Sequence, residues 1–366
     1  MQDHVLSVDE RRLLHALQVQ PRAPWATIAS ALGSDAVTLA RRWARLQEQG
    51  IAWIAVYRAT EHLTTALVEV QCPPSETVRI AEELTRDHEV LTIDVTTGGR
   101  DLLLTLVCEG RDALARFVLD RMGTLPEIRA LRTHLATATI ADARKWRLRE
   151  IDASETAALE PPAPPKRLPK LDHGTAARLR EVLARDPRIT VTALAAELGV
   201  TQPRASGLLA SALATGEVVL RTEIARPFSG WPVYAWYFLD VDPLQRAAAV
   251  QRLTRLSESR LVASVVGGYD IALAVWLRSI DDVARIEAWF AEHVPGVRVA
   301  DRSVVLRTPY HLRKRIDAEG RYRPATTPPS CPGSTPVPVH PETVALSSAN
   351  VNRARTVPPA STPGSQ

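Results

Sequence analysis

The sequence lacks any long hydrophobic run. No apolar stretch among its 366 residues reaches the roughly 18 residues that a membrane-spanning helix needs. Residues 1–10 also lack the basic segment followed by an apolar stretch that makes a signal peptide. We therefore expect a cytoplasmic protein without membrane contact.

Cysteine and the common catalytic motifs are also scarce. Cys72, Cys108 and Cys331 are an odd number of cysteines far apart in the chain, and the motif C-x-x-C does not occur, which argues against a disulfide framework and a cysteine zinc site. The nine histidines include no H-x-x-x-H pair, and neither G-x-x-x-x-G-K-S/T nor G-x-S-x-G is present. We therefore expect no metal, no cofactor and no enzymatic activity.

Neither sign of charge is in large excess. Lys and Arg number 45 against 41 Asp and Glu, a formal net charge of +4. This balance permits an anionic partner without requiring one, so the placement of the cations matters more than their sum.

Two proline-rich stretches interrupt the globular composition. Residues 161–170 read PPAPPKRLPK, and proline fixes φ and removes a hydrogen-bond donor, so we expect an extended linker within residues 146–170. Residues 321–366 contain ten prolines with little apolar periodicity and are expected to be disordered.

The two parts on either side of the linker resemble copies of one another. At an offset of 166, Leu13, Ile28 and Gly33 align with Leu179, Leu194 and Gly199, and further matches follow in order. At an offset of 169, the segment from Gly98 to Asp101 aligns with that from Gly267 to Asp270. Matches in order along both halves indicate a duplication.

The first part of each copy predicts three short helices. Ser7 and Glu10 form a capping-box pattern, a second helix over 25–32 stops at Gly33, and Ser34 or Asp35 can cap a third that ends at Gly50. This is a helix-turn-helix pattern, and the β-rich segment 51–57 after it is typical of a wing. The corresponding segments of the second copy are 178–185, 191–198, 201–214 and the strand 217–222.

The second part of each copy alternates strand and helix patterns. The expected order is βαββαβ, a small sheet with two helices on one face, whose other face must be covered by something else. The expected segments are 64–71, 75–88, 90–97, 101–108, 112–122 and 128–140 in the first copy, and 234–241, 244–256, 262–266, 271–277, 281–293 and 297–307 in the second.

The third helices hold the candidates for DNA contact. A recognition helix needs short polar side chains near its amino end for base edges and Arg or Lys for phosphates. The candidates are Ser34, Asp35, Thr38, Arg41, Arg42 and Arg45 in the first copy, and Thr201, Gln202, Arg204 and Ser206 in the second. The alternative is that these residues form the solvated faces of packed helices, and it weighs more in the second copy, where Arg204 is the only cation between Thr201 and Ala214.

Each copy also places two glycines and an aspartate between strands. Gly98-Gly99-Arg100-Asp101 and Gly267-Gly268-Tyr269-Asp270 supply positive φ and an Asp that can accept hydrogen bonds from backbone amides. On turn chemistry alone, a plain hairpin turn is the favoured interpretation.

The order of these elements resembles the Lrp/AsnC family of feast/famine transcriptional regulators, here occurring twice in tandem. The best local matches are the segments from Leu32 to Ile51, from Thr97 to Leu103 and from Val266 to Ile271. The resemblance implies an α+β fold of two winged helix-turn-helix domains, each followed by a ferredoxin-like βαββαβ ligand-binding (RAM) domain. The implied division is 5–60, 61–145, linker 146–170, 171–225, 230–315 and tail 321–366.

The resemblance also implies a function. The protein is expected to bind double-stranded DNA in a sequence-specific manner, with a small effector such as an amino acid modulating its affinity or assembly. By position in the family, effector contacts fall on Gly98, Gly99, Arg100, Asp101, Gly267, Gly268, Tyr269 and Asp270. The sheet domains are expected to pair face to face, as an internal pseudo-dimer or between chains, and unequal recognition helices would then prefer an asymmetric DNA site.

Two other functions fit the same architecture. Siroheme decarboxylases also combine two such units, and there histidines and basic residues surround a polycarboxylate tetrapyrrole. His62 and His134 lie in the first copy, but the second copy has no counterparts at the repeat offset. The third interpretation is a protein-interaction module whose helix-turn-helix domains no longer bind DNA.

Overall fold

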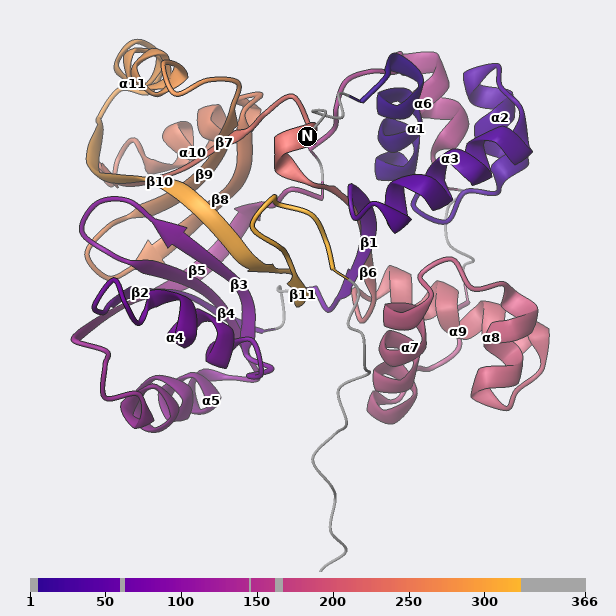
Figure 1. The fold of residues 1–366 in the computed structure, drawn as a ribbon, viewed down its shortest axis with the longest axis horizontal. Helices are drawn as coiled ribbons and strands as arrows, with labels where there is room; N and C mark the ends of the chain where they lie inside the picture. Colours follow the sequence, from indigo (N-terminus) through magenta and orange to yellow (C-terminus); the bar gives the residue numbers. More distant parts are fainter. Residues whose placement is uncertain (1–5, 60–62, 145, 162–166, 324–366) are drawn as a thin grey trace, which may run out of the picture. The chain divides into compact units, whose positions relative to one another are not determined.

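Two successive runs of secondary-structure elements follow the same order along the chain (Figure 1). The computed structural model describes residues 6–59, 63–144, 146–161 and 167–323, which belong to one compact unit. The first run consists of α1 (Val8–Val19), α2 (Trp25–Leu32), α3 (Ala36–Glu48), β1 (Ala52–Tyr57), β2 (Thr64–Gln71), α4 (Thr77–Leu84), β3 (Val90–Thr96), β4 (Leu102–Cys108), α5 (Arg111–Arg116) and β5 (Ala130–Ala141).

The second run repeats this order after a short additional helix, α6 (Ala153–Leu159). It consists of α7 (His173–Arg185), α8 (Val191–Leu198), α9 (Gln202–Ala214), β6 (Val219–Ile224), β7 (Val233–Val241), α10 (Arg246–Arg255), β8 (Ser259–Val266), β9 (Ile271–Leu277), α11 (Asp282–His293) and β10 (Val297–His311), followed by the short β11 (Lys314–Arg315).

The capping residues that the sequence predicts define the helix ends. Ser7 and Glu10 form both hydrogen bonds of a capping box at α1. Asp35, rather than Ser34, caps α3 by accepting a hydrogen bond from the Thr38 amide at 2.8 Å. Gly33 ends α2 at φ 63°, a left-handed conformation that glycine adopts without steric cost.

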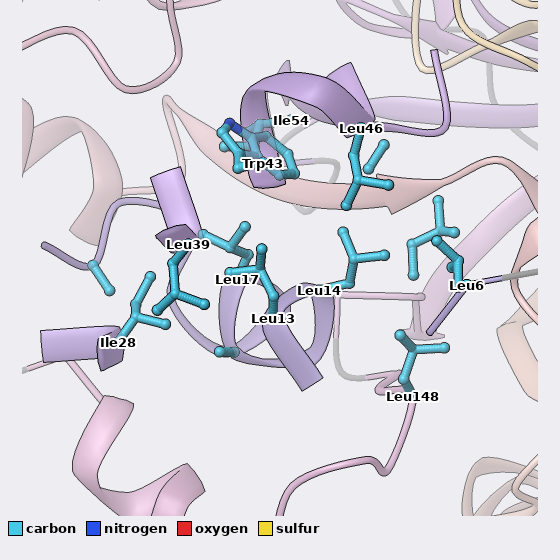
Figure 2. Packing of buried hydrophobic residues seen from close by; sticks show 14 of the residues in the cluster. Leu6, Leu13, Leu14, Leu17, Ile28, Leu39, Trp43, Leu46, Ile54 and Leu148 are labelled. Carbon is cyan, nitrogen blue, oxygen red and sulfur yellow. The ribbon is translucent and has the colours of Figure 1, made fainter. Parts of the chain in front are cut away.

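The first helix-turn-helix core extends beyond its own three helices. Leu13, Leu17 and Leu39 pack together between the helices, as Figure 2 shows. Leu148, from the segment before α6, and Ile224 of β6 complete the same cluster. Segments distant in sequence therefore help to bury this small domain's apolar surface.

The expected linker is in part structured. The sequence predicts an extended linker over 146–170, but α6 forms inside it, with a capping box between Asp152 and Glu155. Leu159 of α6 is fully buried in the first helix-turn-helix core. Residues 162–166, the centre of the proline run, lie outside the described residues.

Nine of the strands described form one sheet that closes on itself, and β1 and β6 form a separate two-stranded sheet. The order is β11-β10-β3-β4-β2-β5-β8-β9-β7, and an additional pairing joins β10 to β7. All pairings are antiparallel, and each copy contributes the four strands of the expected ferredoxin-like unit. Because β5 pairs with β2 and β8, and β10 pairs with β3 and β7, these two long strands join the copies edge to edge.

The inner faces of the two four-stranded sheets cover one another. Leu67 and Leu103 of the first copy pack with Trp236, Phe238 and Ala272 of the second in one buried cluster. On the outer faces, α4 and α5 cover the first sheet, and α10 and α11 cover the second. The face left open in each βαββαβ unit is thus closed by the other copy.

The expected wings are replaced by a shared ribbon. Segment 51–57 does form a strand, β1, but it pairs antiparallel with β6 of the second copy, from Ala52 opposite Ile224 to Tyr57 opposite Val219. The second copy's strand also lies two residues later than the expected 217–222. A strand pattern in sequence does not specify its partner, which explains this difference from a local wing.

The start of the expected disordered tail is structured. Tyr322 donates its backbone amide to the Gly50 carbonyl at 2.8 Å, and Ile316 forms a β-bridge with Tyr322. Residues 324–366, including Cys331, lie outside the described residues. Within the described part of the chain, no helix has the length and apolar character to cross a membrane.

Candidate functional site

The amino end of α3 presents the first group of candidate DNA contacts. Ser34, Asp35 and Thr38 are all exposed. One carboxylate oxygen of Asp35 is committed to the helix, because the amide of Thr38 donates to it and thereby lowers the pKa of Asp35. Ser34 and Thr38 are exposed at the end of the helix that a recognition helix turns toward bases, and the Thr38 side chain also contacts Asp35.

The three arginines of α3 differ in their availability. Arg42 lies 3.2 Å from Asp9, and Arg45 lies 2.6 Å from the buried Glu10, so both guanidinium groups are tied to α1. Arg41 is exposed and forms no ion pair with any residue of the described ranges. Arg41 is therefore the arginine of this helix that can reach a phosphate without breaking an internal contact.

The amino end of α9 is polar but carries less charge. Thr201, Gln202, Arg204 and Ser206 are all exposed. Thr201 occupies the N-cap position without a side-chain capping bond, and Arg204 has no ion-pair partner among the residues that the structure describes. Among the described residues, α9 therefore offers one arginine without an ion pair, Arg204, as α3 offers Arg41.

Two arginines clamp the helix-turn-helix domains to each other. Arg22 donates to the carbonyl oxygens of Pro187 and Ile189, the latter at 2.6 Å. Arg188 donates to the carbonyl of Ala23 at 2.7 Å and to that of Pro21.

This clamp is reciprocal, because Arg22 and Arg188 stand at the repeat offset of 166. Burial lowers the pKa of Arg188 to about 10, and its guanidinium stacks 4.1 Å from the Trp25 ring centroid. The clamp and the β1–β6 ribbon both link the domains that carry α3 and α9.

The first glycine loop is held by its aspartate. Asp101 accepts a hydrogen bond from the amide of Cys72, the residue after β2, at 2.9 Å. Gly98 has φ 91°, and Gly98 and Gly99 are exposed. The aspartate thus serves the turn, and the exposed backbone is the part that a ligand can reach.

The second glycine loop has the same construction. Asp270 accepts from the amide of Val241, the last residue of β7, at 2.9 Å, and also from Arg246 at 2.6 Å. Gly267 lies against His134 of the other copy so closely that an added Cβ would come within 2.5 Å of Nδ1. Only glycine fits there without displacing the imidazole.

Arg100 belongs to the protein interior and not to an exposed loop. It is 2% exposed and donates to Ser303 at 2.9 Å and to Asp301, with its guanidinium 4.3 Å from the centroid of the Phe238 ring. The sequence predicted an effector contact here. Burial and these partners on the second copy leave this side chain unavailable to a ligand in the observed conformation.

Arg100 is one member of a buried polar network between the sheets. Its Nε lies 3.3 Å from Glu69, whose other oxygen lies 2.9 Å from His134 Nε2. The amide of Gly268 points at His134 Nδ1 at 3.3 Å, so this nitrogen accepts and Nε2 donates. Burial raises the pKa of Glu69, but the hydrogen bond from His134 and the charge of Arg100 outweigh burial and hold it below its ordinary value.

Tyr269, which occupies the position of Arg100 in the second copy, completes the same region. Its ring lies 5.0 Å from that of His134 and 4.9 Å from that of Phe238. The two equivalent loops therefore present different side chains to one shared interior.

Sequence reasoning missed the clamp and the polar network. The signal for the clamp was present, since Pro21-Arg22 and Pro187-Arg188 match at the repeat offset. The network gave no such signal, because Glu69 and His134 correspond to Phe238 and Ser303. Across the described ranges, no three His, Cys, Asp or Glu side chains are grouped so that they could hold a metal ion.

Comparison with known proteins identifies both domains of the first copy. Residues 10–47 match the family model of the AsnC-type helix-turn-helix domain, and residues 65–146 match that of the Lrp/AsnC ligand binding domain. An uncharacterized HTH-type transcriptional regulator of Pyrococcus furiosus is 26% identical over 142 residues, which cover 37% of this chain and 93% of the relative. An HTH-type transcriptional regulator of Pyrococcus abyssi is 24% identical over 140 residues, covering 37% and 92%.

A solved structure is similar to most of the chain. The siroheme decarboxylase NirDL, in co-complex with an iron-uroporphyrin III analogue, superposes with a TM-score of 0.52 over 84% of this chain and 93% of that one. The sequence identity is 10%, so the similarity is one of fold.

Proposed function

We propose that the chain, whose residues 10–47 and 65–146 match the two Lrp/AsnC family models, is a transcription regulator that binds DNA through two unequal recognition helices on one chain. The observation that carries the proposal is the pair of exposed amino ends of α3 and α9, each polar, with one free arginine and a defined link to the other.

The proposed contacts divide by chemistry. The short polar side chains are proposed to approach base edges, and the arginines to contact phosphates. The first group contains Ser34, Asp35, Thr38, Thr201, Gln202 and Ser206, and the second contains Arg41, Arg42, Arg45 and Arg204. Arg41 and Arg204 carry most of the phosphate binding in this proposal, because Arg42 and Arg45 already neutralise Asp9 and Glu10.

The proposed DNA site is asymmetric. The clamp through Arg22 and Arg188 and the β1–β6 ribbon fix α3 relative to α9, so both helices of one chain engage one site. Their amino ends differ, with Asp35 opposite Thr201 and Thr38 opposite Arg204 at the repeat offset. Two different half-sites are expected, and perfectly palindromic protected operators would contradict this arrangement.

The small-molecule effector is proposed to act on the sheet domains. The family model of the ligand binding domain covers the first sheet and its glycine loop. The exposed backbone of Gly98, Gly99, Gly267 and Gly268 is the proposed contact, with Asp101 and Asp270 shaping the turns. An amino acid is the proposed effector class. Tyr269 stands at the position of Arg100 with different chemistry, so the two loops need not accept one ligand.

The repeated order of elements also supports a tandem duplication. The proposed units are the helix-turn-helix domains at 5–60 and 171–225 and the sheet domains at 61–145 and 230–315. The equivalent positions of the two glycine loops and of the two clamp arginines support this division.

The test is a mobility-shift titration of the full chain on DNA flanking its own gene, at two salt concentrations and with competitor DNA. Specific, salt-sensitive binding supports the regulator, and Arg41→Gln and Arg204→Gln are expected to weaken it while Arg86→Gln does not. Arg86 is an exposed arginine of the first sheet domain and serves as the matched control.

Absence of specific DNA binding would overturn the proposal. A spectral change on adding siroheme in that case would favour the second candidate, an enzyme of the decarboxylase type, for which the fold similarity over 84% of the chain is the supporting observation.

A further inference from the structure

A cavity of about 440 Å³ lies where the β1–β6 ribbon meets the two sheets. This volume falls within the roughly 300–1,000 Å³ of pockets that hold small organic ligands. Its walls include Trp53 and Tyr57 from β1, Tyr234 and Trp236 from β7, and Trp276 from β9. The aromatic wall favours a flat, apolar body. None of the glycine-loop residues contributes to it.

Three residues that line this cavity have buried polar atoms without partners. Trp53 and Tyr57 are 4% and 6% exposed, and within the described part of the chain neither Trp53 Nε1 nor Tyr57 Oη has a hydrogen-bond partner. Thr65 Oγ1, on β2, is in the same situation. Buried donors are almost always satisfied in folded proteins, so three unpartnered atoms around one cavity point to an acceptor that fills it.

The Tyr57 hydroxyl is protonated at neutral pH, and burial moves its pKa further from neutrality. Burial raises the pKa of Tyr57 to about 12, and the hydroxyl can donate its proton to an acceptor.

The deep wall of the cavity has more cations than anions. Arg221, Arg226 and Arg260 line it together with one buried carboxylate, Glu223. Glu223 is shared, since it pairs with Arg221, lies 3.6 Å from Arg260 Nη2 and lies 3.3 Å from His311 Nε2.

The other acidic lining residues are already neutralised or lie outside this wall. Asp142 pairs with Arg144 at 2.6 Å, Asp317 pairs with Arg323 at 2.8 Å, and Glu319 is exposed. Arg307, the remaining lining cation, is also exposed. The exposed charges of Glu319 and Arg307 do not compensate the buried charges of the cavity wall.

Two of the deep arginines lack a carboxylate of their own. Arg260 is 7% exposed and lies between Trp276, at 3.7 Å from its ring centroid, and Trp146, at 4.5 Å. Burial lowers the pKa of Arg260 to about 9, although Glu223 opposes this shift.

Arg226 donates to the Pro232 carbonyl at 2.8 Å and forms no ion pair with the described residues. Burial lowers its pKa, with Asp94 as the opposing charge behind Trp236. Arg260 is therefore a buried cation and Arg226 a partly buried one, and an anion in the cavity would pair with both.

We propose that this cavity binds an organic anion with a planar, apolar body, whose carboxylate or phosphate group engages Arg226 and Arg260 while its ring packs among Trp53, Tyr234 and Trp276. The buried hydroxyl of Tyr57 donates a further hydrogen bond to the ligand. The site is separate from the glycine loops.

The cavity also connects to the DNA-binding elements, so its ligand regulates them; this part rests on the proposed DNA-binding function. Residues 312–323, the carboxy-terminal strap, line the cavity at Ile316 and Gly320. The strap continues to Tyr322, whose amide binds Gly50 at the end of α3, while Arg321 donates to the Gln49 carbonyl at 3.0 Å. An added Cβ at Gly50 would lie 2.2 Å from the Tyr322 carbonyl oxygen, so the strap packs closely against Gly50 and leaves no room for a side chain there. A ligand that moves the strap or the ribbon therefore acts on α3.

The test compares three probes that share one ring, 1-naphthoate, 1-naphthyl phosphate and the uncharged 1-naphthamide, by calorimetric titration of the full chain without DNA. We expect at least one anion to bind about tenfold or more tightly than the amide, because only the anion pairs with the arginines. The comparison of 1-naphthoate with 1-naphthyl phosphate shows which head group the site prefers. Equal binding of all three, or binding of none, would overturn the proposal.

Single substitutions test whether the anion binds in this cavity. Arg226→Gln is expected to raise the Kd of the preferred anion about tenfold and leave that of the amide unchanged, and Tyr57→Phe to raise it about threefold. The exposed Arg116 of α5 is the matched control, and Arg116→Gln should bind as the parent does. Equal Kd values in Arg226→Gln, Tyr57→Phe and the parent would overturn the assignment.

A mobility shift with and without the preferred anion then tests regulation. The anion is expected to change DNA affinity in the parent and not in Arg226→Gln. Anion binding without any DNA binding would contradict the proposed function and leave the ligand site standing, and DNA binding without anion binding would do the reverse.

Discussion

The two copies differ most at the inner surface where they meet. Residues shared at the repeat offset support the fold in both, such as Asp101 and Asp270, which accept amide hydrogen bonds at the same place in each sheet. At three other aligned positions the first copy has Glu69, Arg100 and His134, whereas the second has Phe238, Tyr269 and Ser303. Only the first set carries charge.

This difference makes the copies complementary and not interchangeable. Arg100 of the first copy needs Asp301 and Ser303 of the second, and His134 accepts from the Gly268 amide. Two first copies facing each other would bring two such charged sets into one interior, at a high desolvation cost. The interior therefore favours pairing of unlike copies.

The largest expected effect on stability comes from removing the buried charge of Arg100, which the second copy lacks. Arg100→Met leaves Glu69 buried with a weakened ion pair, and we expect the free energy of unfolding to fall by about 3–5 kcal/mol. Tyr269→Leu, at the aligned position, should cost about 1–2 kcal/mol through lost aromatic contacts. Urea denaturation monitored by circular dichroism measures both.

Arg132 provides the control for this comparison. It lies 3.6 Å from Glu69, but its side chain is 63% exposed, so Arg132→Met should change stability by less than about 1 kcal/mol. Equal losses for Arg100→Met and Tyr269→Leu would show that the buried charge does not distinguish the copies.

The next effect is a pH dependence from His15 of the first copy, whose aligned position in the second copy has no histidine. His15 Nδ1 accepts the amides of Glu150, at 2.9 Å, and Ile151, and burial followed by the charge of Arg147 lowers its pKa to about 4. The aligned residue of the second copy is Glu181. The unfolded chain binds the proton near pH 6.5 and the folded chain only near pH 4, so stability falls as pH decreases between these values, by up to about 3 kcal/mol.

Thermal unfolding at several pH values measures this effect. His15→Asn keeps an acceptor and removes the titration, so its stability should decline less than that of the parent between pH 6.5 and 4. Parallel curves for the two proteins would contradict the assignment.

A smaller effect tests what the copies share. Asp101→Ala and Asp270→Ala each remove the acceptor for one backbone amide, and each should lower the free energy of unfolding by about 1–2 kcal/mol. The ion pair of Asp270 with Arg246 adds little, because Arg246 is 43% exposed. Both variants are expected to change the effector response more than the DNA affinity without effector.

Chemical denaturation and a DNA titration with effector separate these two readouts. An unchanged response in both variants would leave the aspartates as turn residues alone. A stability loss confined to one copy would contradict the shared role.

The smallest effects concern single phosphate contacts. Arg41→Gln and Arg204→Gln should each reduce the slope of log K against log salt by about 0.9, one contact per copy. Arg42→Gln should change the slope less, because Arg42 is paired with Asp9 at 3.2 Å. Fluorescence anisotropy over a salt series measures the slopes, and a larger change for Arg42 than for Arg41 would reverse this ranking.

Local structure could be predicted from the sequence because short-range chemistry determines it. The capping box at Ser7, the stop of α2 at Gly33 and the bounds of β2 and β9 all follow from residues within a few positions. The expected face-to-face pairing of the sheets also follows, since each unit has an apolar face with no cover of its own.

Long-range partners could not be predicted in the same way. The pairing of β1 with β6, the burial of Arg100 and the packing of α6 depend on segments far apart in the chain. Arg100 follows two glycines and precedes an aspartate, which is the pattern of an exposed turn. Its burial is determined by Phe238, Asp301 and Ser303, none of which is local.

Because β5 and β10 pair with strands of both copies, they affect how the occupancy of a DNA site depends on protein concentration. In a regulator assembled from separate subunits, dilution dissociates the pair before it reaches DNA, and occupancy then rises more steeply than in proportion to concentration. Here both halves are tethered on one chain and joined along two continuous strands, so their pairing is unimolecular. Occupancy of a single site is thus expected to rise in simple proportion to the number of molecules, down to very low copy numbers.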